Sequence, residues 1–307
     1  MAEYRKILNK GIQRLKLAQN RAITSFGLLL FTHNHKKLNV FSKKNVKYGK
    51  YRLQKFDFHV PKKQCTKKLP VVFYVHGGSW CGGDKYGYTM FCGKIAKRNY
   101  CVVNINYRLM PKVSIRTCVA DCLRAMKFFK TSWKTVFEKC KLDCEPDFEN
   151  VFLVGDSAGA HLVSLIAGLH TSKKIDLKMH ISALGLYYGV YDFNNIANDP
   201  SPILTSLDEY FKSVYNDVGS LYRSISTTSY MTKNYPPTFL TSGEIDKLHH
   251  QTEVMHKELK QNKIEVEYLN FEKNRQDARH AFLNAPFLKS AREAFKSLMD
   301  FFERHKQ

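Results

Sequence analysis

The chain has 307 residues, of which 44% are hydrophobic and 13% aromatic, so it can bury a substantial core and is not a disordered chain. No apolar run approaches the roughly 18 residues that a membrane-spanning helix needs. The formal net charge is +22, and residues 1–70 hold 18 Lys or Arg against two acids. Such an excess attracts anionic partners. Because no zinc, helix-turn-helix or RNA-binding signature accompanies it, we expect a solvated basic arm and no nucleic-acid partner.

All eight cysteines fall between Cys65 and Cys144, and none forms a C-x-x-C pair. Metal ligation would need more ligands at closer spacing, so we expect reduced thiols and no metal site. The first ten residues are polar and no adequate apolar segment follows them, which argues against a secretory signal. Together these features predict a cytoplasmic protein.

Residues 1–25 place apolar side chains every three or four positions, from Tyr4 to Ala18, with Lys and Arg elsewhere round the wheel. This pattern predicts a basic amphipathic helix. It could lie on a membrane as a peripheral contact, act as an organelle presequence, or pack on the body of the protein as part of a cap, which is the interpretation we prefer. Residues 32–45 are predicted to be a polar connector. We therefore divide the chain into an N-terminal arm, 1–45, and a main domain, 46–307.

The main domain alternates strands with helices. We expect an edge hairpin over 46–60, and then strands at 69–75, 101–107, 151–154, 180–188, 238–246 and 264–271, with helices at 86–98, 115–130, 158–168, 251–260 and 286–303. This order predicts an α/β fold with a mostly parallel central sheet and helices on both faces. Residues 190–235 break the rhythm, hold a predicted helix at 207–214, and are expected to form a small cap. The carboxyl ends of the strands should meet at one edge, where ligands bind in such sheets.

The strand at 151–154 runs into Gly155-Asp156-Ser157-Ala158-Gly159, and an Ala-rich helical run follows at once. A nucleophile elbow requires this order: a buried strand, a tight turn and a helix. Glycine suits the two flanks because a Cβ there would collide with a neighbouring element. The pattern identifies Ser157 as a candidate nucleophile. The Ala158 N–H, at the start of the helix, is placed to donate to a developing oxyanion.

An elbow serine needs further partners, and each has a candidate. The strand at 69–75 ends in His76-Gly77-Gly78-Ser79-Trp80, whose Gly77 and Gly78 N–H groups could complete an oxyanion hole. A strand ending at Asp246 supplies an acid, and a loop carrying His280 supplies a base, in the order Ser, Asp, His. Glu244 competes with Asp246 for the acid role, since the two residues lie on a similar face. Asp156 is expected to be a structural hydrogen-bonding residue.

At these motifs the sequence resembles the α/β-hydrolase superfamily, in the branch of hormone-sensitive-lipase-like carboxylesterases that carry HGG and GDSAG motifs. The resemblance covers roughly residues 46 to 303, and the Tyr107-Arg-Leu-x-Pro111, Pro236-Pro-Thr238 and His280-x-Phe282 blocks agree with it. The Gly83-Asp-Lys85 segment is also similar to kynurenine formamidases and prenylcysteine methylesterases. The family pattern GE-x-D favours Asp246 over Glu244. There are two departures: Ser79 replaces the third glycine of an HGGG loop, and Arg279 replaces the glycine before the histidine.

The resemblance implies a serine hydrolase that cleaves a small-molecule carboxylic ester through an acyl-enzyme, with no cofactor. Residues 190–235 and the positions just before them interleave tyrosines with Asp, Asn and Ser, which favours an aromatic-walled pocket and hence short or aromatic acyl groups. The tyrosines are Tyr188, Tyr191, Tyr210, Tyr215 and Tyr222. An aryl formamidase or amidase with the same triad is an alternative. A non-catalytic or membrane-docked protein that retains the fold is another, because fold does not prove function. The oligomeric state is left open.

Overall fold

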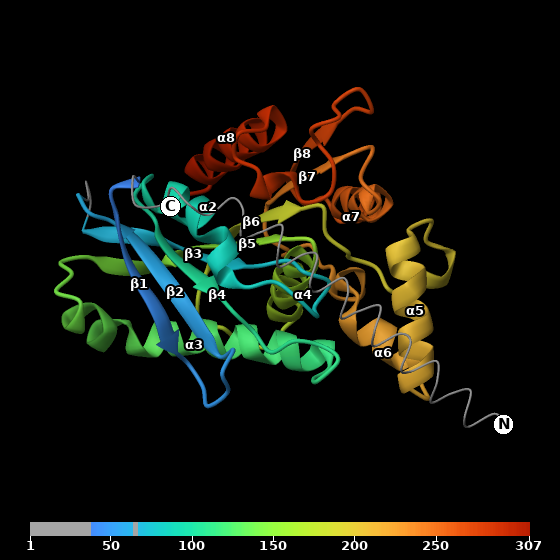
Figure 1. Ribbon diagram of the computed structural model, residues 1–307, viewed down its shortest axis with the longest axis horizontal. Coiled ribbons are helices and arrows are strands. Elements are labelled where there is room, and N and C mark those ends of the chain that lie inside the picture. The colour runs from blue at the N-terminus through green and yellow to red at the C-terminus, as the bar shows by residue number, and fades with distance from the viewer. Residues whose placement is uncertain (1–37, 64–66) are drawn as a thin grey trace.

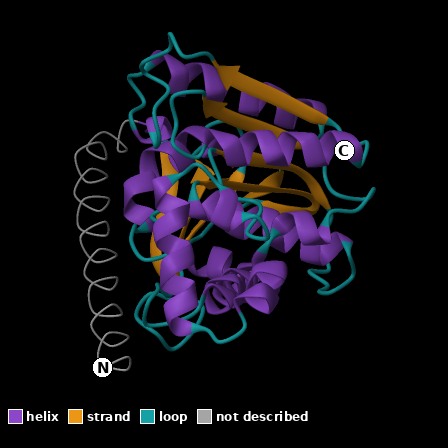
Figure 2. Ribbon diagram, turned by 90° about the vertical axis from the view of Figure 1, so that its right-hand side faces the viewer, coloured by secondary structure: helices purple, strands orange, loops and turns teal. Residues whose placement is uncertain are grey.

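The computed structural model describes residues 38–63 and 67–307, so the helix predicted within residues 1–25 lies outside the described residues. The described chain forms an eight-stranded sheet between two layers of helices (Figures 1 and 2). The strands are β1 (Val40–Lys47), β2 (Lys55–Pro61), β3 (Lys68–Val75), β4 (Cys101–Ile105), β5 (Glu145–Asp156), β6 (Ile181–Tyr187), β7 (Thr238–Gly243) and β8 (Val266–Phe271). The α-helices are α2 (Thr89–Ala96), α3 (Ile115–Lys139), α4 (Ala158–Thr171), α5 (Pro202–Val214), α6 (Val218–Ile225), α7 (His249–Gln261) and α8 (Lys289–Arg304).

The strand order is β1-β2-β4-β3-β5-β6-β7-β8. The first two strands pair antiparallel, β2 is antiparallel to β4, and every other pair is parallel. This confirms the predicted mostly parallel sheet with a hairpin at its edge. The hairpin begins earlier than predicted, because Val40 pairs with Pro61 and Phe41 with Val60. Residues 40–45 therefore belong to the sheet and not to the connector that the polar sequence suggested, since an edge strand tolerates exposed lysines.

Alternation along the strands gives the sheet two apolar faces. In β5, Val151 and Leu153 belong to the core beneath α3, α4 and α7, whereas Phe152 and Val154 belong to the core beneath α2 and α8. The ring of Phe152 lies 4.3 Å from that of Phe302 on α8, measured between centroids. Burying a side chain of this size contributes about 1.5–3 kcal/mol. The central strand is thus held from both sides, which fixes the position of the residues that follow it.

Two helical segments extend beyond their predicted limits. The helix α3 was predicted to end at residue 130 but continues to Lys139, because Phe137 still packs on the sheet, 5.2 Å from Phe58. Within residues 190–235 the structure contains α5 and also α6, which the sequence analysis did not predict. Among the helices of the described ranges, none has both the length and the apolar character needed to cross a membrane.

Candidate active site

The turn between β5 and α4 has the geometry of a nucleophile elbow. Ser157 has φ 50° and ψ −121°, a strained conformation for a residue with a side chain. A Cβ on Gly155 would lie 2.4 Å from the carbonyl carbon of Gly159, and one on Gly159 would lie 2.0 Å from the Val75 carbonyl oxygen. Because no side chain fits at either flank, the two glycines let the strand, the turn and the helix approach closely.

Three predicted residues from different parts of the chain meet at this elbow. Ser157 Oγ lies 3.1 Å from His280 Nε2, and His280 Nδ1 lies 3.0 and 2.9 Å from the two carboxylate oxygens of Asp246. In the tautomer that satisfies both contacts, Nδ1–H donates to the carboxylate and Nε2 accepts from the serine hydroxyl. Asp246 also accepts a hydrogen bond from the Leu248 N–H, and its side chain is fully buried. The imidazole is 32% exposed, so solvent reaches the base.

The competing acid, Glu244, points elsewhere. Its carboxylate accepts hydrogen bonds from the Asn270 side-chain amide, at 3.1 Å, and from the Lys273 N–H, at 3.2 Å. Both partners lie on or just after β8. Of the two acids on the loop that follows β7, Asp246 is the one in contact with the histidine.

The charge state of His280 is set by two opposing effects. Burial disfavours the imidazolium, but the Asp246 carboxylate, through its charge and its hydrogen bond, together with the charge of Asp156, raises the pKa of His280 above its ordinary value. A raised pKa makes the imidazole a stronger base for a serine proton.

The predicted oxyanion donors are only partly supported by the structure. The Gly77 N–H donates to Asp156 Oδ1 at 2.8 Å, so this donor is already occupied, which counts against Gly77 as an oxyanion ligand. Gly78 has φ +121°, a conformation that favours glycine, and follows directly on this anchored residue. Ala158 begins α4, so its N–H has no acceptor within the helix. Gly78 and Ala158 remain the candidate donors.

Asp156 anchors this loop through a buried network, as predicted for a structural residue. Its carboxylate accepts hydrogen bonds from the hydroxyls of Tyr74, at 2.7 Å, and Tyr88, at 2.9 Å, besides the Gly77 N–H. Burial raises the pKa of Asp156, and these hydrogen bonds oppose that shift. His76 supports the same loop, since its Nδ1 lies 2.7 Å from the Gly77 carbonyl oxygen.

A second buried contact ties the loop to the predicted cap. Trp80 Nε1 donates to His161 Nδ1 at 2.9 Å, and His161 Nε2 donates to the Ile225 carbonyl oxygen at 2.7 Å. Both contacts require the neutral imidazole with its proton on Nε2. Burial lowers the pKa of His161 to about 4, so the neutral form persists at physiological pH.

The sequence pattern counts Tyr188 among the tyrosines that favour an aromatic-walled pocket, but it does not place this residue beside His280. Tyr188 follows β6 with φ 37°, is fully buried, and packs its ring edge-on against the His280 imidazole at 5.0 Å between centroids. Its N–H donates to the Thr241 carbonyl oxygen at 2.8 Å, which fixes the backbone. A tyrosine at the carboxyl end of a strand was visible in the sequence, but nothing local indicates that it faces a histidine 92 positions away.

The tyrosines predicted to wall a pocket lie mostly in the protein core. Four of them are buried, and Tyr215 is partly buried: the four are Tyr188, Tyr191, Tyr210 and Tyr222. The Tyr222 hydroxyl donates to Asp208 on α5. In the described structure these rings hold the segment together internally, and the aromatic-walled pocket stays a prediction.

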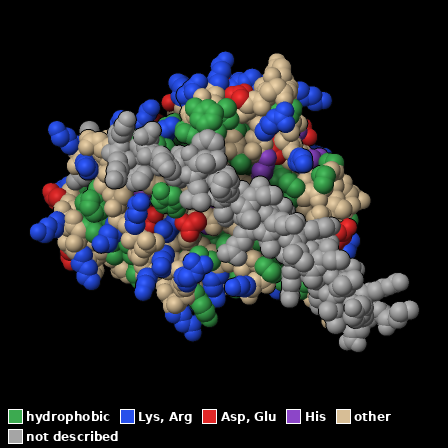
Figure 3. Space-filling model, viewed as in Figure 1, with side chains coloured by type: hydrophobic (Ala, Val, Ile, Leu, Met, Phe, Trp, Pro, Cys, Tyr) green, Lys and Arg blue, Asp and Glu red, His purple; other side chains and the backbone are tan. Residues whose placement is uncertain are grey.

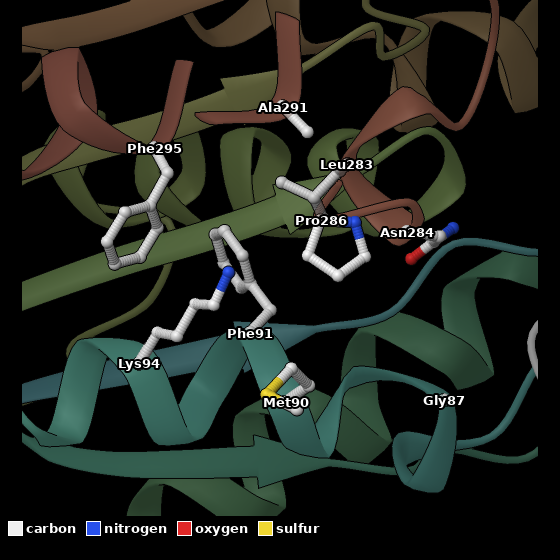
Figure 4. A pocket seen from close by; sticks show the side chains of 9 residues that line it. All are labelled: Gly87, Met90, Phe91, Lys94, Leu283, Asn284, Pro286, Ala291 and Phe295. Atoms are coloured by element: carbon white, nitrogen blue, oxygen red, sulfur yellow. The ribbon is translucent and has the colours of Figure 1, made fainter. Parts of the chain in front are cut away.

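Neither of two cavities in the described structure is lined by Ser157 or His280. One, of about 20 Å³, lies between α2 and the segment that leads into α8, where Figure 4 shows Phe91, Phe295 and Lys94 around it. It has room for about one water molecule and not for an acyl substrate. The other, of about 470 Å³, is polar and lies between residues 192–199 and α7. Its size would suit a small ligand, but the triad is not part of it.

Comparison with known proteins identifies the family. The family model described as BD-FAE matches residues 56–259, about two thirds of the chain. The chain belongs to the BD-FAE family. This confirms the predicted membership of the α/β-hydrolase superfamily, and the BD-FAE match includes the elbow and Asp246 but ends before His280.

Several curated relatives are named as esterases. The probable carboxylic ester hydrolase LipM of Mycobacterium tuberculosis is 27% identical over 214 residues, which cover 66% of this chain and 48% of that protein. Esterase LipQ of the same organism is 27% identical over 188 residues, covering 59% and 42%. Rabbit arylacetamide deacetylase is 33% identical over 133 residues, covering 42% and 32%. The chain thus spans about half the length, or less, of these relatives.

Solved structures share the fold across nearly the whole chain. Esterase B from Lactobacillus rhamnosis has a TM-score of 0.80 at 18% identity, covering 99% of this chain and 96% of that one. A bacterial heroin esterase has a TM-score of 0.75 at 17% identity, covering 95% and 92%. At these identities the likeness establishes the α/β-hydrolase fold.

Proposed function

We propose that this BD-FAE family member hydrolyses carboxylic esters through an acyl-enzyme formed on Ser157. The observation that carries the proposal is the continuous hydrogen-bonded chain from Asp246 through His280 to the Ser157 hydroxyl at the elbow. Curated relatives named as carboxylic ester hydrolases support the choice of an ester as substrate.

In the proposed reaction His280 removes the proton from the Ser157 hydroxyl as its oxygen attacks the acyl carbonyl. Asp246 holds the imidazole in the tautomer that can accept this proton. The Gly78 and Ala158 N–H groups stabilise the oxyanion of the tetrahedral intermediate. His280 then protonates the departing alkoxide, which leaves as an alcohol, and a water activated by the same imidazole releases the acid.

We further propose short or aromatic acyl groups as the preferred substrates. An enzyme that acts on long-chain lipid at an oil-water interface needs a broad exposed apolar platform. In the described part of the chain the exposed large hydrophobic residues are few and scattered: Tyr51, Tyr86, Val214 and Phe287. The buried Trp80 beside the oxyanion loop, with its contact to His161, adds bulk on one side of the elbow.

The test compares wild type with Ser157→Ala, using p-nitrophenyl esters from acetate to palmitate together with an aryl formamide and an aryl amide. We expect ester turnover that is highest for short chains and abolished in Ser157→Ala, because the nucleophilic oxygen is lost. Ser172→Ala, at the other end of α4, is the matched control and should retain full activity. Near wild-type turnover by Ser157→Ala would refute the proposed nucleophile. A preference for the formamide or amide would show that the same triad acts on the alternative substrate class and not on esters.

A further inference from the structure

Charge is divided unevenly between the two halves of the described chain. Residues 38–142 contain 23 Lys or Arg and four acids, a net charge of +19, whereas residues 143–307 contain 18 Lys or Arg and 22 acids, a net charge of −4. Two of the four acids in the first half, Asp57 and Asp121, are buried and paired with Lys85 and Arg108. The exposed acids of this half therefore neutralise little of its positive charge. A lysine-rich composition alone would not separate the signs in this way.

The positive half includes two neighbouring elements that carry many cations, the β1–β2 hairpin and α3. The hairpin packs directly on the helix, since the Phe56 ring lies 5.8 Å from that of Phe129 and the Phe58 ring 5.2 Å from that of Phe137. We call the following exposed side chains of these two elements the basic face: Lys47, Lys50, Arg52, Arg124, Lys127 and Lys134. The three on α3 are spaced by three and seven positions, so they project from one side of the helix. Figure 3 shows Lys and Arg side chains gathered along this lower margin of the molecule.

An exposed aromatic ring stands within the basic face. Tyr51, at the turn of the hairpin, is 46% exposed and lies between Lys50 and Arg52 in the sequence. The Arg108 guanidinium lies 4.3 Å from the centroid of its ring and holds the ring in place. An amphipathic aromatic side chain flanked by cations is typical of protein segments at the headgroup level of a bilayer.

The turn that carries Tyr51 lies at the same edge of the sheet as the candidate active site. The strand β1 is antiparallel to β2, and β2 is antiparallel to β4, so β1 runs in the same direction as β4, β3 and β5. Residues 48–54 follow the carboxyl end of β1, just as Ser157 follows the carboxyl end of β5. A planar surface bound at this turn would lie along the edge at which Ser157 is found.

We propose that the basic face is a docking surface for an anionic phospholipid bilayer. The cations provide long-range attraction to the negative headgroups. The negative half of the chain is repelled by the same headgroups, and this repulsion orients the protein with its basic face toward the bilayer. We choose a lipid surface over nucleic acid because an exposed tyrosine flanked by cations, as at Tyr51, suits the headgroup level of a bilayer. The proposal concerns binding and does not depend on the reaction at Ser157.

The experiment measures binding of the full chain to vesicles by co-sedimentation. The vesicles contain phosphatidylcholine alone or with 30 mol% phosphatidylserine, in about 0.1 M and about 0.3 M NaCl. The test variant is Lys47→Gln/Arg52→Gln/Arg124→Gln/Lys127→Gln. The matched control removes four exposed lysines from the other half of the chain: Lys173→Gln/Lys174→Gln/Lys257→Gln/Lys260→Gln. Circular dichroism and ester turnover check that both variants fold.

Wild type should bind the anionic vesicles, should bind them less at the higher salt, and should not bind the neutral vesicles. Each cation near an anionic leaflet strengthens partition onto the vesicle by about fivefold. The affinity of the test variant for anionic vesicles should therefore fall at least about tenfold, while the affinity of the control should stay within about threefold of wild type. Tyr51→Ser in the wild-type chain should weaken binding to the anionic vesicles, and the loss should be clearest at high salt, where charge is screened. Equal losses in the two quadruple variants would overturn the proposal, because binding would then follow net charge alone. Binding to duplex DNA or RNA but not to the anionic vesicles would overturn it as well.

Discussion

The assignment of the acid can be tested with one pair of substitutions, Asp246→Asn and Glu244→Gln. In Asp246→Asn, one of the two oxygens that face His280 Nδ1, at 3.0 and 2.9 Å, becomes an amide NH₂. That donor would hold the imidazole in the tautomer with its proton on Nε2, which then points at Ser157 Oγ and cannot accept the serine proton. A wrong tautomer costs about 10,000-fold in kcat in a comparable triad, or about 5 kcal/mol at 1.36 kcal/mol per tenfold.

Glu244→Gln is the matched control, because it makes the same chemical change two residues away. The glutamine keeps an oxygen that can accept from the Asn270 amide or the Lys273 N–H, so kcat should stay within about twofold of wild type. The assay is steady-state hydrolysis of p-nitrophenyl acetate, with thermal unfolding to confirm the fold. If Glu244→Gln proved the more damaging change, the acid would have been misassigned.

The same pair predicts a difference in pH dependence. The base must be neutral to act, so kcat/KM should fall as the pH drops through the pKa of His280, which lies above its ordinary value of about 6.5. Because the Asp246 charge raises that pKa, the residual activity of Asp246→Asn should have its midpoint at lower pH, whereas the midpoint of Glu244→Gln should not move. A midpoint that stayed unchanged in Asp246→Asn would contradict the electrostatic role of this carboxylate.

Three further predictions follow from buried or strained residues. Burial lowers the pKa of His161 to about 4, so its contribution to stability is complete above about pH 6.5 and is lost as the pH falls toward 4. The loss in the free energy of unfolding is about 3 kcal/mol. Urea unfolding at several pH values should show this pH dependence in wild type and not in His161→Gln. Tyr188→Phe keeps the ring against His280 and should stay within about threefold in kcat, while Tyr188→Leu should lose about tenfold or more and shift the pH profile; equal activities would show that the ring does not position the base. Ser79 has φ 52°, so Ser79→Gly should relieve backbone strain of about 1 kcal/mol and broaden the range of acyl chains, as measured by the ester series; an unchanged series would exclude Ser79 from the acyl site.

The arrangement of the candidate triad could be predicted from sequence because topology makes distant strand ends coincide. Ser157, Asp246 and His280 each follow a strand of one mostly parallel sheet, so their carboxyl ends meet whatever the separation along the chain. The two glycines of the elbow report a close approach of backbones, which is a local requirement. The roles of the three residues remain part of the proposed mechanism.

Other features depend on contacts that a linear pattern does not contain. The Gly77 N–H was predicted to be free, but it is taken by a carboxylate 79 residues away. Residues 40–45 look like a connector because their lysines are exposed on an edge strand. The tyrosines after β6 were expected to line a pocket, yet an apolar ring with a polar tip can also pack inside the protein, as Tyr191 and Tyr222 do with hydrogen-bonded hydroxyls.

The position of Asp156 links two parts of the candidate site that are usually considered separately. Its carboxylate fixes the loop of Gly77 and Gly78 through the Gly77 N–H, and its charge also contributes to the raised pKa of His280. Replacing it with Asn would therefore be expected to loosen the loop that carries Gly78 and to make the base weaker at the same time. Tyr74 and Tyr88 keep this carboxylate hydrogen-bonded in a site without solvent, where an unpaired charge would be costly. Asp156 thus affects the candidate oxyanion donor Gly78 through the position of the loop and the proposed base His280 through its charge. A change in kcat at this position could therefore not be assigned to either group alone.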